Sequence, residues 1–306
     1  MRVFVFLAAL FISLSAYAEP MRISISIPGP GAAAYLPVEL IPKIGTDKAE
    51  GAEVRVVFAP SGPAALEEML TNNVDFSVTG MPSAMSIRLT DKRLVALAAI
   101  NDLPLYALVV REGLRGTVNE ISDLRGKAIG LHSNSLATKS TSQQVLELML
   151  RRGGVSPGAY RIVPIGRRWE TESLMLRNGE VDALVADEPY VGRMTQEKIA
   201  FPLVHLGYPE TARMYSGSGF LRGVLVGRAD RVEKNPAKAE KMVRIIKQTL
   251  HWIATHSAEE FADKLGVTDR GERQRLIETL RNFPRQFSRD GSFSQRQLRE
   301  TEIFFI

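Results

Sequence analysis

Residues 69–82 read MLTNNVDFSVTGMP, and residues 175–189 read MLRNGEVDALVADEP. In both stretches a predicted helix ends at Met-Leu and runs into a turn that contains Asn. A Val-Asp pair then opens a short apolar strand, and a proline follows the valine by eight positions. Because proline is favoured in the first turn of a helix, each stretch predicts a helix, a turn, a buried strand and a new helix.

The repeated pattern predicts an α/β fold with two similar lobes. Strands that alternate with helices form a mostly parallel sheet with helices on both faces. Apolar segments at 105–110 and 220–226 are expected to connect the two units, and the apolar end of the chain is expected to pack on the body. Further strands are predicted at 21–27, 53–58, 94–100, 128–131, 160–165 and 203–206, and helices at 236–256, 258–265 and 269–282.

Composition is that of a globular protein with a sizeable core. The chain has 306 residues, of which 45% are hydrophobic and 24% are charged. This length suits one large domain or two ordinary ones. The sequence contains no Cys, which excludes disulfides, thiolate catalysis, Cys-ligated metals and a lipidated N-terminal Cys. The net charge of +5 comes from many Arg residues without interleaved aromatics, so we expect no nucleic-acid binding.

The first 18 residues have the pattern of a secretory signal peptide. Arg2 precedes an apolar run at 3–14, and Ala16-Tyr17-Ala18 forms an Ala-x-Ala cleavage site. The alternative is an N-terminal membrane anchor, but the run is shorter than the roughly 20 residues that a span needs. We therefore expect export to the periplasm and cleavage after Ala18.

Polar turns are predicted at the carboxyl ends of the parallel strands. Ligands bind at that edge of an α/β sheet, where helix N-termini present free N–H groups and partial positive charge. The turns lie at 28–31, 61–63, 80–83, 132–135 and 187–189, and Tyr35 lies in the first turn of a predicted helix at 32–41. The candidate ligand-binding residues are Pro30, Tyr35, Ser61, Gly62, Gly80, Met81, Pro82, His132, Ser133, Asn134, Arg168, Asp187 and Glu188.

Each of these assignments has a structural alternative. Ordinary strand-to-helix turns use the same residue types, so any single turn could be only a turn. His132 is either a ligand contact or a capping residue. Asp187 and Glu188 could hold a ligand amine, pair with Arg167 or Arg168, or simply favour a helix N-terminus through the helix dipole.

Sequence patterns of catalysis, metal binding and dinucleotide binding are missing or weak. The four His residues do not form His-x-x-x-His or His-Glu-x-x-His spacing, and residues 59–63 lack the Gly-x-Ser-x-Gly pattern of a nucleophile elbow. The turn at 28–31 carries prolines and lacks the third Gly of a dinucleotide fingerprint. We therefore expect no metal, no cofactor and no enzymatic activity.

Several short motifs follow one another along the chain: Leu36-Pro37, Gly62-Pro63-Ala64, Val74-Asp75, Gly80-Met81-Pro82, Asp123-Leu124-Arg125-Gly126-Lys127, Ser133, Gly179-Glu180-Val181-Asp182-Ala183 and Glu188-Pro189-Tyr190. In this order and spacing they resemble the periplasmic solute-binding proteins of nitrate, sulfonate and taurine ABC importers (the NMT1/THI5-like type, which includes thiamine-precursor binders). The resemblance spans nearly all of the predicted mature chain. The chain departs from the family after Leu36-Pro37, where residues 43–47 replace the usual Gly-Phe-Phe segment, and at Asp187, where an aromatic residue is common.

The resemblance implies a two-lobed periplasmic binding protein of type II, the Venus-flytrap arrangement, with a mostly parallel sheet flanked by helices in each lobe. Lobe one would comprise residues 21–104 and 221–306, and lobe two residues 105–220. The lobes would close over a small-molecule solute, and a membrane ABC permease would bind the closed form transiently. We expect a monomer. Two alternatives stay open: a sensory module that presents its solute to a membrane receptor or kinase, and an enzyme such as a dehydratase or pyrimidine synthase.

The charge of the solute is left open by the sequence. Arg167, Arg168 and the helix N-termini favour an anion, whereas Asp187 and Glu188 favour a cation or an amine. A zwitterion such as a taurine-like compound would satisfy both sets of residues.

Overall fold

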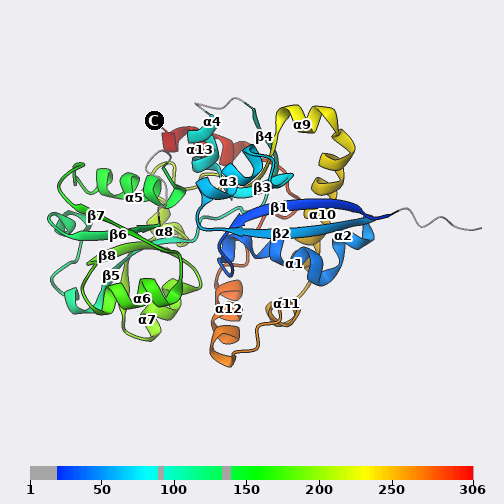
Figure 1. The fold of residues 1–306 in the computed structure, drawn as a ribbon. Helices are drawn as coiled ribbons and strands as arrows, with labels where there is room; N and C mark the ends of the chain where they lie inside the picture. The colour runs from blue at the N-terminus through cyan, green and yellow to red at the C-terminus, as the bar shows by residue number, and fades with distance from the viewer. Residues whose placement is uncertain (1–18, 89–92, 133–138, 306) are drawn as a thin grey trace, which may run out of the picture.

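The computed structural model describes residues 19–88, 93–132 and 139–305. The predicted signal peptide and the predicted site residues Ser133 and Asn134 lie outside the described residues. Figure 1 shows two sheets side by side, each covered by helices. Within the described residues, no helix is both long enough and apolar enough to cross a bilayer.

The first sheet has the strand order β2-β1-β3-β10-β4. Strand β1 pairs in parallel with β2 and β3, and only β10 runs antiparallel to its two neighbours. The chain reaches this sheet twice, because β10 returns from the second sheet. The strands are β1 Met21–Pro28, β2 Ala52–Ala59, β3 Phe76–Gly80, β4 Leu94–Ala99 and β10 Gly223–Arg228.

The second sheet repeats this order as β7-β6-β8-β5-β9. Here β6 pairs in parallel with β7 and β8, and β5 is the antiparallel strand in the fourth position. The expectation of two similar, mostly parallel sheets is confirmed, and β3 and β8 are the two copies of the repeat. The strands are β5 Tyr106–Arg111, β6 Ala128–His132, β7 Arg161–Ile165, β8 Ala183–Asp187 and β9 Ala200–His205.

The Asp of each copy joins its strand, which is the central strand of its sheet, to the neighbouring parallel strand. The Asp75 carboxylate accepts the backbone N–H of Ser24 on β1 at 2.8 Å, and Asp75 donates its own N–H to the Ser24 carbonyl at 3.0 Å. In the second sheet, Asp182 makes the same pair of bonds with Ala128, at 3.0 and 2.7 Å. The repeated Asp therefore has a structural role, because it extends the strand pairing by one residue before β3 and β8 begin.

The sheets are covered by amphipathic helices whose apolar faces form the cores. In the long helix α10, Met242, Ile245, Ile246 and Leu250 are buried against the first sheet, as their spacing predicts. The helices over the two sheets begin with α1 Leu36–Ile44, α2 Thr46–Ala49, α3 Gly62–Leu70, α4 Met81–Arg88, α5 Thr141–Arg152, α6 Trp169–Arg177, α7 Tyr190–Gln196 and α8 Pro209–Ala212. They continue with α9 Ala229–Lys234, α10 Pro236–Thr255, α11 Ala258–Leu265, α12 Arg270–Asn282 and α13 Gln295–Phe305, and short 3-10 helices cover Ala33–Tyr35, Glu112–Leu114 and Ile121–Leu124.

The last helix, α13, lies across the junction of the two sheets (Figure 1). Thr301 accepts the N–H of Leu221, in the segment that returns to the first sheet, at 2.9 Å. Three residues later, Phe304 packs on Phe220 at 4.7 Å and joins the core of the second sheet. The end of the chain therefore packs on the body as expected, with contacts to Leu221 and Phe220.

Candidate functional site

The predicted edge of each sheet faces the other sheet. Strands β1 and β3 end at Pro28 and Gly80, β6 and β8 end at His132 and Asp187, and side chains from both sheets meet between them. The helix α3 also begins there, and the Ser61 hydroxyl caps it by accepting the N–H of Ala64 at 3.3 Å. We call this region the cleft.

Two arginines and one aspartate form the centre of the cleft. Arg222 is 1% exposed and precedes β10 of the first sheet. Its Nη2 atom donates to Asp187 Oδ2 at 3.0 Å and to Oδ1 at 3.2 Å, and Asp187 is the last residue of β8 in the second sheet. Arg167, from the loop before α6, donates to Asp187 Oδ2 at 2.7 Å. The ion cluster therefore connects the two sheets.

Two tyrosines hold the Arg222 guanidinium in place. The Tyr35 hydroxyl accepts from Arg222 Nη1 at 3.1 Å, and the guanidinium lies 4.2 Å from the centre of the Tyr106 ring. Tyr35 comes from the first lobe and Tyr106 opens β5 in the second. A cation over an aromatic face is attracted to it, more strongly when both are removed from water.

Burial disfavours the charge on each member of this cluster, but their mutual attraction outweighs the effect of burial. Burial alone would raise the pKa of Asp187, yet Arg222 and Arg167 hold that pKa below its ordinary value. Burial would lower the pKa of each arginine, and Asp187 instead raises the pKa of both. Burial also raises the pKa of Tyr106, so its phenol stays protonated. The cluster thus carries two positive charges and one negative charge at neutral pH.

A buried histidine and glutamate lie beside Arg167. His132 Nε2 is 2.8 Å from Glu172 Oε1, and both residues line the smaller of two cavities in the cleft. Four buried polar atoms of the cleft have no hydrogen-bond partner among the described residues: His132 Nδ1, Glu172 Oε2, Thr79 Oγ1 and Arg222 Nε. Buried polar groups are nearly always paired, so these atoms are available to a bound solute.

The free space in the cleft is small because the two lobes touch. A cavity bordered by Tyr35, Ser61, Thr79 and Arg167 has a volume of about 20 Å³, and the cavity beside Glu172 has about 10 Å³. These volumes are close to that of a single water molecule. A larger solute can enter only when the lobes separate.

Hydrogen bonds between the lobes close the cleft on two sides. Ser83 Oγ lies 3.0 Å from Thr141 Oγ1, which joins α4 to α5. On the other side, the N–H of Ala33 donates to the carbonyl of Glu188 at 3.2 Å. The described conformation is therefore closed.

The two predicted glycines lie where the backbone approaches another side chain. A β-carbon on Gly80 would overlap the Thr141 side chain, at 2.8 Å from its β-carbon, across the contact between the lobes. A β-carbon on Gly62 would lie 2.6 Å from Thr79 Oγ1. Glycine at 80 therefore allows the close approach of the two lobes, and glycine at 62 allows α3 to approach β3.

Most of the predicted site residues surround the cleft. Pro30 and Glu188 line the smaller cavity, Met81 donates its N–H to the Arg222 carbonyl at 3.2 Å, and Pro82 is buried. Arg168 is exposed, whereas its neighbour Arg167 holds Asp187. The predicted residues that line a cavity of the cleft are Pro30, Tyr35, Ser61, Gly62, His132, Asp187 and Glu188.

The carboxylate of Glu188 is engaged by the protein itself. Its Oε2 atom accepts the N–H of Gly192 in the first turn of α7 at 3.1 Å, and its Oε1 atom lies 3.2 Å from His205 Nε2. Both carboxylate oxygens of Glu188 therefore have partners within the protein. The contact with Gly192 fits the alternative that Glu188 stabilises a helix N-terminus.

Arg222, Tyr106, Thr79 and Thr141 belong to the cleft but were not predicted from the sequence. The signal for Arg222 was present, because it interrupts an otherwise apolar run at 220–226. A charged residue in a buried run needs a partner of opposite charge, and Asp187 at the end of another buried strand is such a partner.

Comparisons with known proteins agree on the fold. At 19% identity, a protein of Bordetella bronchiseptica RB50 has a structure that matches with a TM-score of 0.82, covering 94% of this chain and 89% of that one. The alkanesulfonate-binding protein SsuA from Xanthomonas axonopodis pv. citri, bound to MOPS, matches with a TM-score of 0.73 at 15% identity, covering 93% and 91%. The desulfurization enzyme DSZB matches with a TM-score of 0.61 at 16% identity, covering 93% and 90%.

At these low identities, the structural matches show the fold alone. SsuA, a binding protein, and DSZB, an enzyme, both have this fold. No curated protein matches the sequence of this chain. The model of the NMT1/THI5-like family matches residues 48–260, which include every strand of both sheets except β1 and all of α10. The chain belongs to the NMT1/THI5-like family.

Proposed function

We propose that this protein is a periplasmic solute-binding protein that captures a small anionic solute in the cleft and delivers it to an ABC importer. The observation that carries the proposal is the pair of buried guanidinium groups, Arg222 and Arg167, that face the single carboxylate of Asp187. Arginine binds carboxylate, sulfonate and similar oxyanions through charge-assisted hydrogen bonds, which are stronger than neutral ones. The structural similarity to the alkanesulfonate-binding protein SsuA also supports an anionic solute.

An anion fits this cleft better than an amine or a zwitterion. An amine would need a carboxylate, but Asp187 is held by two arginines and Glu188 by Gly192 and His205. Glu172 offers one unpaired oxygen, Oε2, and it lies beside the positively charged Arg167. An anion instead meets Arg167, the unpaired Thr79 hydroxyl and the Tyr35 hydroxyl, which line the cavity. The solute therefore competes with Asp187 for the two guanidinium groups.

Closure of the lobes couples solute binding to transport. The cluster draws groups from both sheets, so a solute that contacts Arg222 and Arg167 together binds the closed form better than the open form. That difference in affinity shifts the population toward closure, and a permease that binds both lobes recognises it. We propose that the mature chain acts as a monomer after cleavage behind Ala18.

A screen of solutes by thermal unfolding tests this proposal. A ligand that binds only the folded state raises the melting temperature by mass action. The panel contains nitrate, bicarbonate, alkanesulfonates, taurine and pyrimidines, with a neutral alcohol of matched size beside each anion. At least one anion is expected to raise the melting temperature, and its neutral counterpart is not. If no anion stabilises the protein and no solute co-purifies with it, the proposal is wrong.

An enzyme is the second candidate, because the cleft also holds a buried histidine and glutamate, which are residue types that enzymes use for general acid-base catalysis. His132 and Glu172 lie 2.8 Å apart beside Arg167, and the fold is shared with the desulfurization enzyme DSZB. Incubation of the anion found in the screen with the protein distinguishes the two functions. A binding protein returns the compound unchanged, whereas an enzyme converts it, and His132→Gln then abolishes the conversion.

A sensory module remains the alternative within the binding function. It would capture the solute in the same cleft but present it to a membrane receptor or kinase. Reconstitution with a candidate permease decides between them, because only an importer stimulates ATP hydrolysis when the solute-loaded protein is added.

A further inference from the structure

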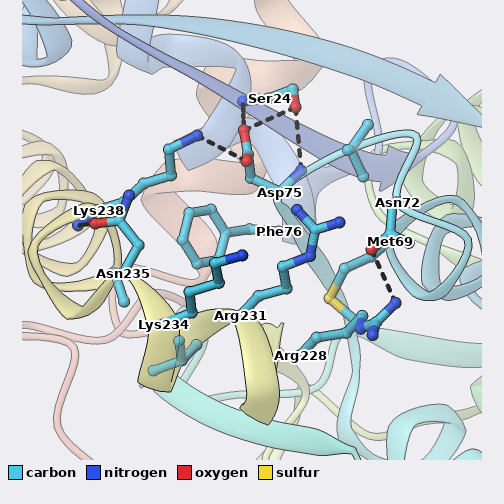
Figure 2. Close-up of a pocket in the computed structure, with 13 residues that line it drawn as sticks. Ser24, Met69, Asn72, Asp75, Phe76, Arg228, Arg231, Lys234, Asn235 and Lys238 are labelled. Carbon is cyan, nitrogen blue, oxygen red and sulfur yellow. Dashed lines mark hydrogen bonds and ion pairs between the residues drawn. The ribbon is translucent and has the colours of Figure 1, made fainter.

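The first lobe has a second and larger pocket at the opposite end of its sheet. Strand β3 ends in the cleft at Gly80, whereas this pocket lies at its beginning, around Asp75 and Phe76 (Figure 2). The other walls come from α9 and the first turns of α10. The pocket has a volume of about 320 Å³, compared with about 20 Å³ for the main cavity of the cleft. That volume is within the range of small-molecule sites. We call it the α9 pocket.

Two ion pairs give the α9 pocket fixed walls. Arg228 donates to Asp230 through Nε and Nη2 and to the Leu70 carbonyl and the Asn72 side chain through Nη1. On the facing wall, Lys238 donates to Asp75 at 2.8 Å. The charges of these two cations are thus already matched by carboxylates, and their side chains are held in place.

Two further cations in the lining are not matched. Arg231 and Lys234 lie three residues apart on α9, and their side chains form no hydrogen bond or ion pair with the part of the chain that the structure describes. Figure 2 shows both side chains reaching into the pocket beside the Phe76 ring. The lining therefore has an excess of positive charge that faces an aromatic side chain.

The lining also includes apolar side chains, which are those of Phe76, Met69, Val74, Val232 and Ala239. An inorganic ion would make no use of them. The combination of apolar side chains and two unmatched cations matches a ligand that has an anionic group on an apolar body.

We propose that the α9 pocket binds a small organic anion, with its charged group between Arg231 and Lys234 and its apolar body against Phe76. The site is separate from the cleft, so its occupancy does not require the lobes to separate. Arg231 supplies paired N–H groups for an oxyanion and Lys234 supplies a compact charge, while the fixed walls limit the entropy lost on binding.

Titration with phenyl phosphate, followed by ligand-observed NMR at low salt, tests the α9 pocket. The double variant Arg231→Gln/Lys234→Gln is expected to weaken binding by about tenfold or more, because it removes both charge-assisted contacts. The matched control Lys264→Gln/Arg270→Gln removes the same charge from exposed positions outside the pocket and is expected to leave binding unchanged. Phenol, which has the ring without the charge, and inorganic phosphate, which has the charge without the ring, should both bind more weakly.

Several results would overturn the assignment. One is that phenyl phosphate does not bind at millimolar concentration. Another is that the two double variants lose affinity for it equally. A third is that inorganic phosphate binds as tightly as phenyl phosphate. If Arg167→Gln loses affinity for phenyl phosphate while Arg231→Gln/Lys234→Gln binds it as the wild type does, phenyl phosphate binds in the cleft instead. The cleft proposal is judged separately, since its variants and its solutes are different.

Discussion

Arg222 Nη2 contacts both carboxylate oxygens of Asp187, at 3.0 and 3.2 Å, across the junction of the two sheets. The arginine belongs to the first sheet and the aspartate to the second, so this contact exists only while the lobes are closed. Both side chains are buried, which makes the pair sensitive to the loss of either partner. The pair is therefore a direct link between the charge in the cleft and the conformation of the protein.

The substitution Asp187→Asn is expected to open the lobes. It leaves two buried guanidinium groups without a carboxylate, and breaking a buried pair in this way costs about 3–5 kcal/mol. Small-angle X-ray scattering of the solute-free protein should then give a larger radius of gyration than the wild type gives. Asp263→Asn, which breaks an exposed pair with Arg273, is the control and should leave the scattering unchanged. Identical curves for all three proteins would contradict the link between charge and closure.

Lowering the pH should decrease the free energy of unfolding, because Asp187 becomes protonated. Its pKa in the folded protein is below the ordinary value, so its contribution to stability is fully present above the unfolded pKa of about 3.9. That contribution is lost as the pH falls through the lower folded value. The free energy of unfolding, measured by urea titration, should decline more steeply below about pH 4 in the wild type than in Asp187→Asn. Parallel declines would show that Asp187 is not held by the arginines.

The two repeated aspartates should stabilise both sheets to a similar extent. Asp75→Ala and Asp182→Ala each leave a strand N–H, that of Ser24 or Ala128, without its carboxylate acceptor. An unsatisfied buried donor costs about 1–3 kcal/mol, which urea unfolding can measure. Glu180→Ala, at an exposed position within the second copy, should change stability much less. If the aspartate variants unfold at the same urea concentration as Glu180→Ala, the structural role of the repeat is wrong.

Closure should also depend on Gly80. The variant Gly80→Ala places a β-carbon on the Thr141 side chain, so it should keep the lobes apart and weaken solute binding while each lobe still folds. The second substitution Thr141→Gly, combined with Gly80→Ala, should restore affinity because it removes the overlap. Gly166→Ala is a suitable control, since its β-carbon would meet nothing within 4 Å. Affinity that is insensitive to Gly80→Ala would mean that binding does not need this contact.

The sequence alone was sufficient to locate the edge of each sheet but not the orientation of its side chains. Strand positions and the two copies of the repeat follow from local patterns, and those patterns correctly indicated Tyr35, Ser61, His132 and Asp187 as neighbours. The choice between Arg167 and Arg168 depends on which side chain the loop turns toward Asp187, and this is decided by contacts that are distant in the sequence.

Glu188 and Arg222 illustrate the same limit. Glu188 is engaged by His205, 17 residues away, and Arg222 by Asp187, 35 residues away. Residue spacing along one strand or helix does not reveal such partners. A charged residue inside an apolar run indicates only that it has a partner of opposite charge. The packing of the two lobes determines which residue is that partner.

The central claim is that buried guanidinium groups of the cleft hold an anionic solute. Isothermal titration calorimetry of Arg167→Gln and Arg168→Gln, with the anion selected by the thermal screen, tests it most directly. The two substitutions remove the same charge from adjacent residues, but only Arg167 contacts Asp187 in the cleft. We predict that Arg167→Gln weakens binding by about tenfold or more, and that Arg168→Gln binds as the wild type does. Equal affinity in the two variants, or a loss only in Arg168→Gln, would contradict the account.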